Sequence, residues 1–194
     1  MTRLTLICHA ATEAVGAARF PDDEAVDEGA AVSASFGPPI VARLWLAGPE
    51  RRTVATAAAL RGDRAVMVDQ ELRDWDCGGW RGQTVEDLQR RDAAGLAAWL
   101  TDPTAAPHGG ESLTDLLARV EGWMSQQAVA QGKTAAVTHP AILRAALVAA
   151  IDAPPAAFWR IDARPLSRAE LSHDGRRWVL QSLVPPAKRL STPL

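Results

Sequence analysis

Short apolar runs alternate with segments of helical periodicity along most of the chain. Four of the runs predict strands, namely Thr5–Cys8, Arg43–Ala47, Ala65–Asp69 and Thr134–Thr138. Two later runs, Arg168–His173 and Arg177–Leu183, flank an Asp174-Gly175 turn of the hairpin type. The C-terminal part of the chain therefore predicts an antiparallel pair of strands.

Segments between these runs predict helices, namely Pro49–Arg61, Thr84–Leu100, Glu111–Met124 and a segment from Pro140 to about Ile151. The third is the clearest, because its apolar residues recur at intervals of three and four and so lie on one face. Pro49 suits a first helical turn, where a missing N–H costs nothing. The segment Asp74–Gly82 contains three glycines and two tryptophans and predicts a loop.

The alternation of strands and helices predicts the fold class. It is typical of an α/β protein, here a three-layer sandwich with a mostly parallel central sheet and helices on both faces. No repeat or long linker divides the chain, so we expect one domain over residues 1–194, with a surface tail at 185–194. Ligands of such sheets bind at the carboxyl ends of strands, and His9 and His139 directly follow two predicted strands.

Composition and charge exclude several classes of protein. Apolar residues make up 47% and charged residues 23% of the chain, as in ordinary globular domains. No run reaches the roughly 18 uncharged residues of a membrane span. The first residues also lack the pattern of a signal peptide, so we expect a cytoplasmic protein without a membrane partner. The net charge is −2 without a basic stripe, which argues against a nucleic-acid partner.

Few residues are candidates for chemistry. The two cysteines have no CxxC spacing, and no metal-binding pattern such as HExxH occurs, so we expect neither a metal nor another cofactor. His9 and His139 follow strands, whereas Arg52 and Glu111 stand in the predicted first turns of two helices. Each of these residues also has a common structural role. A histidine at a strand end often only forms a structural hydrogen bond, an arginine such as Arg52 often belongs to a solvated charged face, and a carboxylate such as Glu111 often complements a helix dipole.

Six segments occur in an order that is typical of one family. They are Leu6–Thr12, Arg19-Phe20, Gly48–Ala57, Leu72–Asp74 with Gly78–Gly82, Gly109–Ser112 and Val137–Arg144. These segments match, in turn, an Arg-His-Gly-x-Thr strand end, an Arg-Phe pair, a Ser-Pro-x-x-Arg segment, Leu-x-Glu and Gly-x-Trp-x-Gly elements, a Gly-Gly-Glu-Ser motif and a Val-x-His-Gly-Gly-x-x-Arg segment. Over nearly its whole length the chain resembles the histidine phosphatase superfamily, which has a phosphoglycerate-mutase-like fold.

The resemblance implies a cofactor-independent phosphomonoesterase that works through a phosphohistidine intermediate. It gives His9 the role of nucleophile and Arg52 the role of binding the phosphoryl oxygens. His139 would stabilise negative charge beside a helix N-terminus. Glu111 would act as general acid for the leaving oxygen and then as general base for water.

Three further residues are expected to contact the substrate. Thr12 belongs to the first motif, Arg19 follows the loop after His9, and His108 directly precedes the Gly-Gly-Glu-Ser motif. The expected partner is a small phosphorylated metabolite. The sequence leaves its identity open, and it also leaves open whether the protein forms a homodimer.

The chain departs from the family at the expected phosphate site. Cys8 stands where the family has its first phosphate-binding arginine, while Ala10, Val15 and Pro140-Ala141 replace a glycine, an asparagine and a Gly-Gly pair. A hydrogen bond to a charged group contributes about 1.5–3 kcal/mol, so this change is expected to weaken catalysis. Arg19 is the local candidate to take the place of the missing arginine.

These departures define two alternatives and one expectation about pH. The chain could be a degenerate relative that binds an anionic ligand without turnover, although it retains all four principal candidates. Cys8 itself is not the expected nucleophile, because a C-x5-R loop would need arginine where Ala14 stands. Loss of a positive charge beside His9 predicts that the pKa of this histidine drifts upward, within a bell-shaped pH profile.

Overall fold

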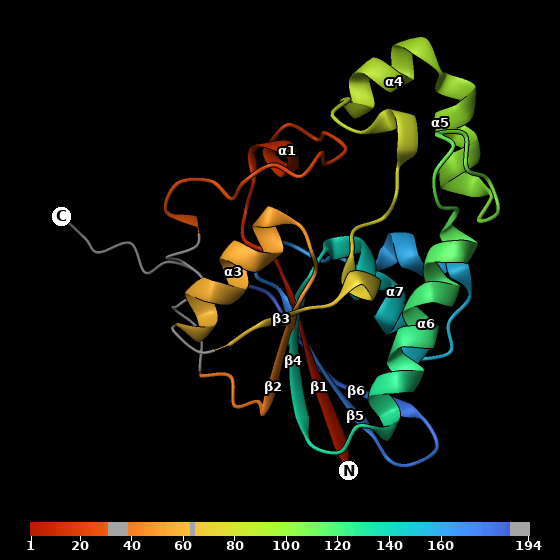
Figure 1. Cartoon of the computed structure of the whole chain (residues 1–194). Helices are drawn as coiled ribbons and strands as arrows, with labels where there is room; N and C mark the ends of the chain where they lie inside the picture. Colours follow the sequence, from red (N-terminus) through yellow and green to blue (C-terminus); the bar gives the residue numbers. More distant parts are fainter. Residues whose placement is uncertain (31–38, 63–64, 187–194) are drawn as a thin grey trace, which may run out of the picture.

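The centre of the molecule is a sheet of six strands, seen in a computed structural model that describes residues 1–30, 39–62 and 65–186 (Figure 1). The strands are β1 (Thr2–Cys8), β2 (Leu44–Ala47), β3 (Met67–Val68), β4 (Lys133–Thr138), β5 (Arg168–His173) and β6 (Trp178–Val184). Their order in the sheet is β3-β2-β4-β1-β5-β6. The first four run parallel, whereas β5 runs antiparallel to β1 and β6 antiparallel to β5. The predicted α/β fold with a mostly parallel sheet is confirmed.

Helices cover both faces of this sheet, with α3 (Arg51–Arg61) on one face and α6 (Leu113–Val129) and α7 (Pro140–Ala150) on the other (Figure 1). The described chain also has helices α1 (Glu13–Gly16), α4 (Val85–Arg91) and α5 (Ala93–Thr101) and the 3₁₀ turns η2 (Gln70–Leu72), η3 (Gly78–Trp80) and η4 (Pro155–Arg160). Side chains alternate along β1, so Ile7 packs in the cluster beneath α3 while Leu4 and Leu6 pack in the larger cluster with α6 and α7. In Figure 1, α1, α4 and α5 lie beyond the carboxyl end of β1.

Two elements differ from the sequence predictions in extent. The predicted helix Thr84–Leu100 is two helices, because the side chain of Asp92 accepts a hydrogen bond from the Gly95 N–H and starts α5 as a new helix. The predicted strand Ala65–Asp69 is reduced to β3, whose two residues are exposed. Its pairing with β2 spans only two residues, so this edge of the sheet is short.

The start of α6 matters for the site. Ser112 is the N-cap and forms a capping box with Asp115, so the helix begins at Leu113. Glu111, predicted to stand in the first turn, precedes the helix instead. Asp115 is the carboxylate that complements the N-terminus of this helix.

The predicted surface tail at 185–194 is described only in part. Of the predicted surface tail, residues 187–194 lie outside the described residues. Within the described ranges, every helix is too short or too polar to cross a lipid bilayer.

Candidate active site

Two histidines meet at the carboxyl ends of neighbouring strands. β1 and β4 pair in parallel with Cys8 opposite Thr138, so the next residues, His9 and His139, lie side by side. Their ring centroids are 5.3 Å apart at an angle of 63°. Both side chains are buried. The shared edge of the sheet thus brings together two of the residues that the sequence analysis selected.

The ring of His9 is held in one tautomer. Its Nδ1 lies 2.7 Å from the carbonyl oxygen of Ala10, and a carbonyl can only accept, so Nδ1 carries the hydrogen and Nε2 keeps its lone pair. Burial lowers the pKa of His9 to about 4, and the positive charges of His139 and Arg52 act in the same direction. The predicted upward drift is relative to a site that keeps the arginine and stays a prediction; in this structure burial is the largest influence on the pKa of His9.

Arg52 is buried and does not belong to a solvated face. It is the second residue of α3 and is 1% exposed. Its Nη2 lies 2.6 Å from Oδ2 of Asp74, and its Nη1 lies 3.8 Å from Oε2 of Glu24. Among the described residues, Nε and Nη1 of Arg52 have no hydrogen-bond acceptor. A buried guanidinium with unused donors is suited to an anion with several oxygens.

Asp74 is the carboxylate that the structure adds to this group. Besides its contact with Arg52, its Oδ2 lies 3.3 Å from Nδ1 of His139. Burial raises the pKa of Asp74, but the charges of His139, Arg52 and His9 lower it by more, so the net direction is down. The sequence contained a signal for this residue, since Leu72–Asp74 corresponds to the Leu-x-Glu element.

Glu50 is a second carboxylate that sequence reasoning missed. Its Oε2 lies 2.7 Å from Nε2 of His139, and its Oε1 accepts a hydrogen bond from the Asp74 N–H at 2.9 Å. Gly48 permits this approach, because a Cβ there would lie 3.2 Å from Nε2 of His139 and 2.7 Å from the carbonyl oxygen of Leu72. Burial raises the pKa of Glu50, but its hydrogen bond to His139 and the charge of that ring lower it overall. His139 therefore stands between two carboxylates.

The structure does not place Glu111 where a general acid would be needed. Its carboxylate is bound on both oxygens by Arg119, with Nε–Oε1 at 2.7 Å and Nη2–Oε2 at 2.8 Å. Arg119 also donates to the carbonyl oxygens of Glu71 and Arg73, in the loop that carries Asp74. Glu111 does not line the cavity beside His9; Arg52 and His139 do not line it either, but both contact Asp74, which does. The capped start of α6 explains the placement of Glu111, and the Glu111–Arg119 pair fixes the loop before Asp74.

The three further substrate-binding candidates are less directly placed. Thr12 caps α1 and its hydroxyl donates to Glu24 at 3.0 Å. Arg19 lines the cavity beside His9, but its guanidinium contacts Glu13 at 3.3 Å on the outer surface. His108 lies outside that cavity lining, where its Nδ1 accepts from the Gly110 N–H and its ring packs on Trp80.

The variant position Cys8 is the last residue of β1 and is fully buried. Burial raises the pKa of its thiol to about 12, so the sulfur is not a thiolate at neutral pH. Cys8 and Cys77 are both free thiols. This placement agrees with a packing role for Cys8 and gives no support to a cysteine nucleophile.

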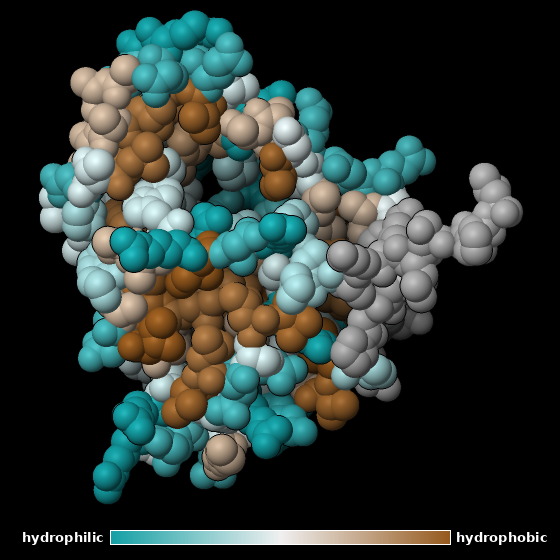
Figure 2. Space-filling view, turned by 180° about the vertical axis from the view of Figure 1, so that it is seen from behind, coloured by the Kyte–Doolittle hydropathy of each residue, from teal (hydrophilic) through white to brown (hydrophobic). Residues whose placement is uncertain are grey.

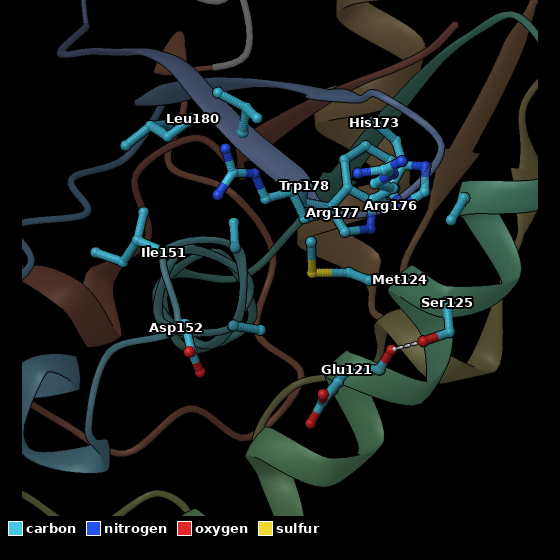
Figure 3. Close-up of a pocket in the computed structure, with 14 residues that line it drawn as sticks. Glu121, Met124, Ser125, Ile151, Asp152, His173, Arg176, Arg177, Trp178 and Leu180 are labelled. Atoms are coloured by element: carbon cyan, nitrogen blue, oxygen red, sulfur yellow. Dashed lines mark hydrogen bonds between the residues drawn. The ribbon is translucent and has the colours of Figure 1, made fainter.

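Beside His9 lies a cavity of about 180 Å³, whose wall also includes Asp74, Arg19 and Arg144. A larger groove of about 660 Å³ lies at the hairpin end of the sheet, between α6, α7 and the β5–β6 hairpin (Figure 3). It contains His173 and Arg177 but none of the predicted site residues. Among the residues that the structure describes, no cluster of three or more His, Cys, Asp or Glu side chains is arranged to hold a metal ion. The cavity beside His9 is the candidate active site.

Comparison with known proteins gives the family. A model of the histidine phosphatase superfamily (branch 1) matches residues 4–185, and the chain belongs to this superfamily. The resemblance seen in the sequence is thereby confirmed.

Individual relatives agree with this assignment. A bifunctional protein of Mycobacterium tuberculosis is 36% identical over 126 residues, which cover 63% of this chain and 34% of that protein. The glucosyl-3-phosphoglycerate phosphatase of the same species is 42% identical over 72 residues, or 36% of this chain and 32% of that one. The chain thus spans about a third of the length of these curated relatives.

Solved structures show the same fold over the whole molecule. The mycobacterial glucosyl-3-phosphoglycerate phosphatase in complex with VO3 superposes with a TM-score of 0.81 at 26% identity, covering 97% of this chain and 100% of that one. A phosphoserine phosphatase mutant from Entamoeba histolytica, in complex with phosphoserine, has a TM-score of 0.85 at 18% identity, covering 95% and 97%. The second likeness concerns the fold alone.

Proposed function

We propose that this protein is a phosphatase that hydrolyses the phosphate monoester of a small metabolite through a phosphohistidine on His9. The observation that carries the proposal is a neutral His9 with a free Nε2, placed next to His139 and to the buried Arg52. Within the described part of the chain, Nε and Nη1 of Arg52 are buried without a hydrogen-bond acceptor, and Nδ1 of His139 makes no hydrogen bond although Oδ2 of Asp74 lies 3.3 Å away. Phosphoryl oxygens would supply these acceptors. Membership of the superfamily supports the same function.

The reaction has two balanced steps. In the first, Nε2 of His9 attacks phosphorus, the bond from phosphorus to the leaving oxygen breaks, and Asp74 gives its proton to that oxygen. In the second, water attacks the phosphohistidine, Asp74 takes a proton from the water, and His9 and inorganic phosphate are released. Asp74 is ionised in the free protein, and the negative charge of a bound phosphate favours its protonation. Asp74 thus takes the role that the sequence analysis gave to Glu111.

Arg144, which matches the arginine at the end of the Val-x-His-Gly-Gly-x-x-Arg segment, is the cavity residue that would compensate for the arginine missing at Cys8. It lines the cavity beside His9, and its charge acts on the thiol of Cys8 and lowers the pKa of that group against the larger effect of burial. Its Nε donates to the carbonyl oxygen of Ile161 at 2.8 Å, and its Cζ lies 5.7 Å from the ring centre of Phe158, so the side chain is fixed. No described carboxylate lies within 4 Å of this guanidinium, whereas Arg19 is paired with Glu13.

The alternative is a protein that binds an anion without turning it over. The observation in its favour is the number of carboxylates at the site, since Glu24, Glu50 and Asp74 all lie near Arg52 or His139. These charges compete with a phosphate for the same cations. They leave the nucleophile and its tautomer intact, which is why we favour the enzyme.

Phosphate release by the purified full chain, measured over a panel of phosphomonoesters with a chelator present, tests the proposal. We expect at least one ester to be hydrolysed and the rate to fall by about 10³-fold or more in His9→Ala. His173→Ala is the matched control, because this histidine stands at the hairpin, outside the cavity. Equal rates for the wild type and His9→Ala on every ester would overturn the enzyme. Tight phosphate binding by both would then favour the alternative.

A further inference from the structure

The cavity beside His9 has an aromatic wall. Phe20, Trp75, Trp99, Phe158 and Trp159 line it, and they come from the loop after α1, the loop after η2, α5 and η4. Apolar residues also gather beside a hollow beneath the hydrophilic tip of the molecule in Figure 2. Phe20, Trp75 and Phe158 belong to the main hydrophobic cluster, and Trp99 and Trp159 pack against it, so the wall is the side of the core that faces the cavity.

The rings support one another, so the wall is preformed. The centroids of Trp99 and Trp159 are 4.8 Å apart, and those of Trp75 and Trp99 are 5.0 Å apart. Phe20 packs edge-on against Trp99 at 5.4 Å. The indole N–H of Trp75 donates to the carbonyl oxygen of Glu111 at 2.6 Å, which fixes that ring. A ligand that enters this cavity meets an ordered apolar surface.

We infer that the leaving group of the substrate is a flat, apolar ring system, an inference that rests on the proposed phosphatase function. His9 and Asp74 mark the phosphate end of the cavity, and the aromatic wall is where the alcohol part of the ester would lie. Against the aromatic wall a polar alcohol would lose its water without gaining partners, because the charged lining residues Arg19, Glu24 and Arg144 do not belong to that wall, whereas a ring gains the burial of its surface. The volume of about 180 Å³ is below that of most ligand pockets and suits a small group.

Trp99 adds one polar feature to this wall. Its indole N–H is buried and has no hydrogen-bond acceptor among the residues described. A ring that carries an oxygen or nitrogen acceptor would satisfy this donor. The preferred alcohol therefore has an apolar ring with at most one acceptor.

A pair of alkyl esters tests the inference, because esters of similar alcohols differ little in intrinsic reactivity. We expect kcat/KM of the wild type for 2-phenylethyl phosphate to exceed that for O-phosphoserine by about 10- to 100-fold. Ethyl phosphate serves as the reference without a ring. The ratio of kcat/KM for the phenylethyl ester to that for the ethyl ester should fall about tenfold in Trp99→Ala and less in Trp99→Phe. Trp178→Ala, in the hairpin groove, is the control and should keep the wild-type ratio.

The outcomes separate this inference from the proposed function. If O-phosphoserine is hydrolysed as fast as 2-phenylethyl phosphate or faster, the inference of an aromatic leaving group is wrong. The proposed phosphatase function would still stand. If no ester is hydrolysed, the proposed phosphatase function is wrong. Ligand binding then tests separately whether the cavity prefers an aromatic group. Tryptophan fluorescence of His9→Ala should then report tighter binding of 2-phenylethyl phosphate than of O-phosphoserine, and equal binding would overturn the inference.

Discussion

Oδ2 of Asp74 lies 2.6 Å from Nη2 of Arg52, and through this contact the loop after η2 reaches the start of α3 and the residues proposed to bind phosphate. The Asp74 N–H is held in turn by Glu50, and the preceding carbonyls are held by Arg119. Asp74 is thus fixed from both sides. A carboxylate that is fixed in this way can donate a proton and accept one at a fixed position in the site.

Asp74→Asn is expected to lower kcat for alkyl phosphates by about 10²- to 10⁴-fold, because the leaving oxygen loses its proton donor. An aryl ester such as p-nitrophenyl phosphate, whose leaving group needs no proton, should lose much less. Steady-state kinetics with both esters measure the difference. An equal loss for both esters would contradict the acid role of Asp74.

Glu111→Gln is the matched comparison to Asp74→Asn. It removes one charge of a largely buried ion pair, for which breaking costs about 3–5 kcal/mol, so the main effect should be on stability. Thermal unfolding should show a lowered Tm, while the ratio of alkyl to aryl ester hydrolysis stays close to that of the wild type. A selective loss of alkyl ester hydrolysis would restore Glu111 as the acid.

The pH dependence follows from the lowered pKa of His9. The pKa is about 4 in the folded protein, so His9 is neutral and nucleophilic above that pH. The acid limb of kcat/KM is therefore expected near pH 4, well below the ordinary histidine value of about 6.5. A pH–rate profile of the wild type measures it, and an acid limb at pH 6 to 7 would contradict the burial argument.

The same shift affects stability. The unfolded chain binds a proton on His9 below about pH 6.5, and the folded chain only below about pH 4, so stability is lost as the pH falls between these values. The loss should amount to about 3 kcal/mol by pH 4 and should be absent in His9→Asn. Denaturant unfolding of both proteins at pH 6.5 and 4.5 gives the comparison. A parallel loss in both proteins would assign it to other groups.

Glu50→Gln should strengthen the binding of phosphate. The variant keeps an oxygen for the Asp74 N–H but removes a negative charge 2.7 Å from Nε2 of His139. We expect the inhibition constant of orthophosphate to fall about tenfold, while kcat falls because His139 is less firmly held. Glu86→Gln, at an exposed carboxylate of α4 outside the cavity lining, is the control. A weaker inhibition by phosphate would show that the charge of Glu50 does not compete with the ligand.

Arg144→Met tests the substitute for the missing arginine. We expect kcat/KM to fall about 10- to 100-fold, because the variant loses a charged hydrogen-bond donor to the phosphate. Arg19→Ala should change kcat/KM less than about threefold. Thermal unfolding controls for the lost hydrogen bond from Arg144 to Ile161. The reverse order of effects would return the role to Arg19.

The sequence by itself determined the sheet, its helices and the positions of the two histidines. Strand and helix periodicities are local, and two parallel strands that end in histidine must bring them to one edge of the sheet. The order of the motifs also identified the family. These features depend on short-range patterns and on the regular geometry of a sheet.

Only the tertiary structure decided which carboxylates join the site. The motifs mark the positions of Asp74 and Glu111 but do not show which carboxylate meets which cation: Glu50 meets His139 across 89 positions and Asp74 meets Arg52 across 22. Such contacts depend on how loops fold against distant elements, and no local pattern encodes them. Burial is the second such property: it lowers the pKa of His9 to about 4, and no local pattern predicts this, because the cost of a buried charge depends on everything that packs around it.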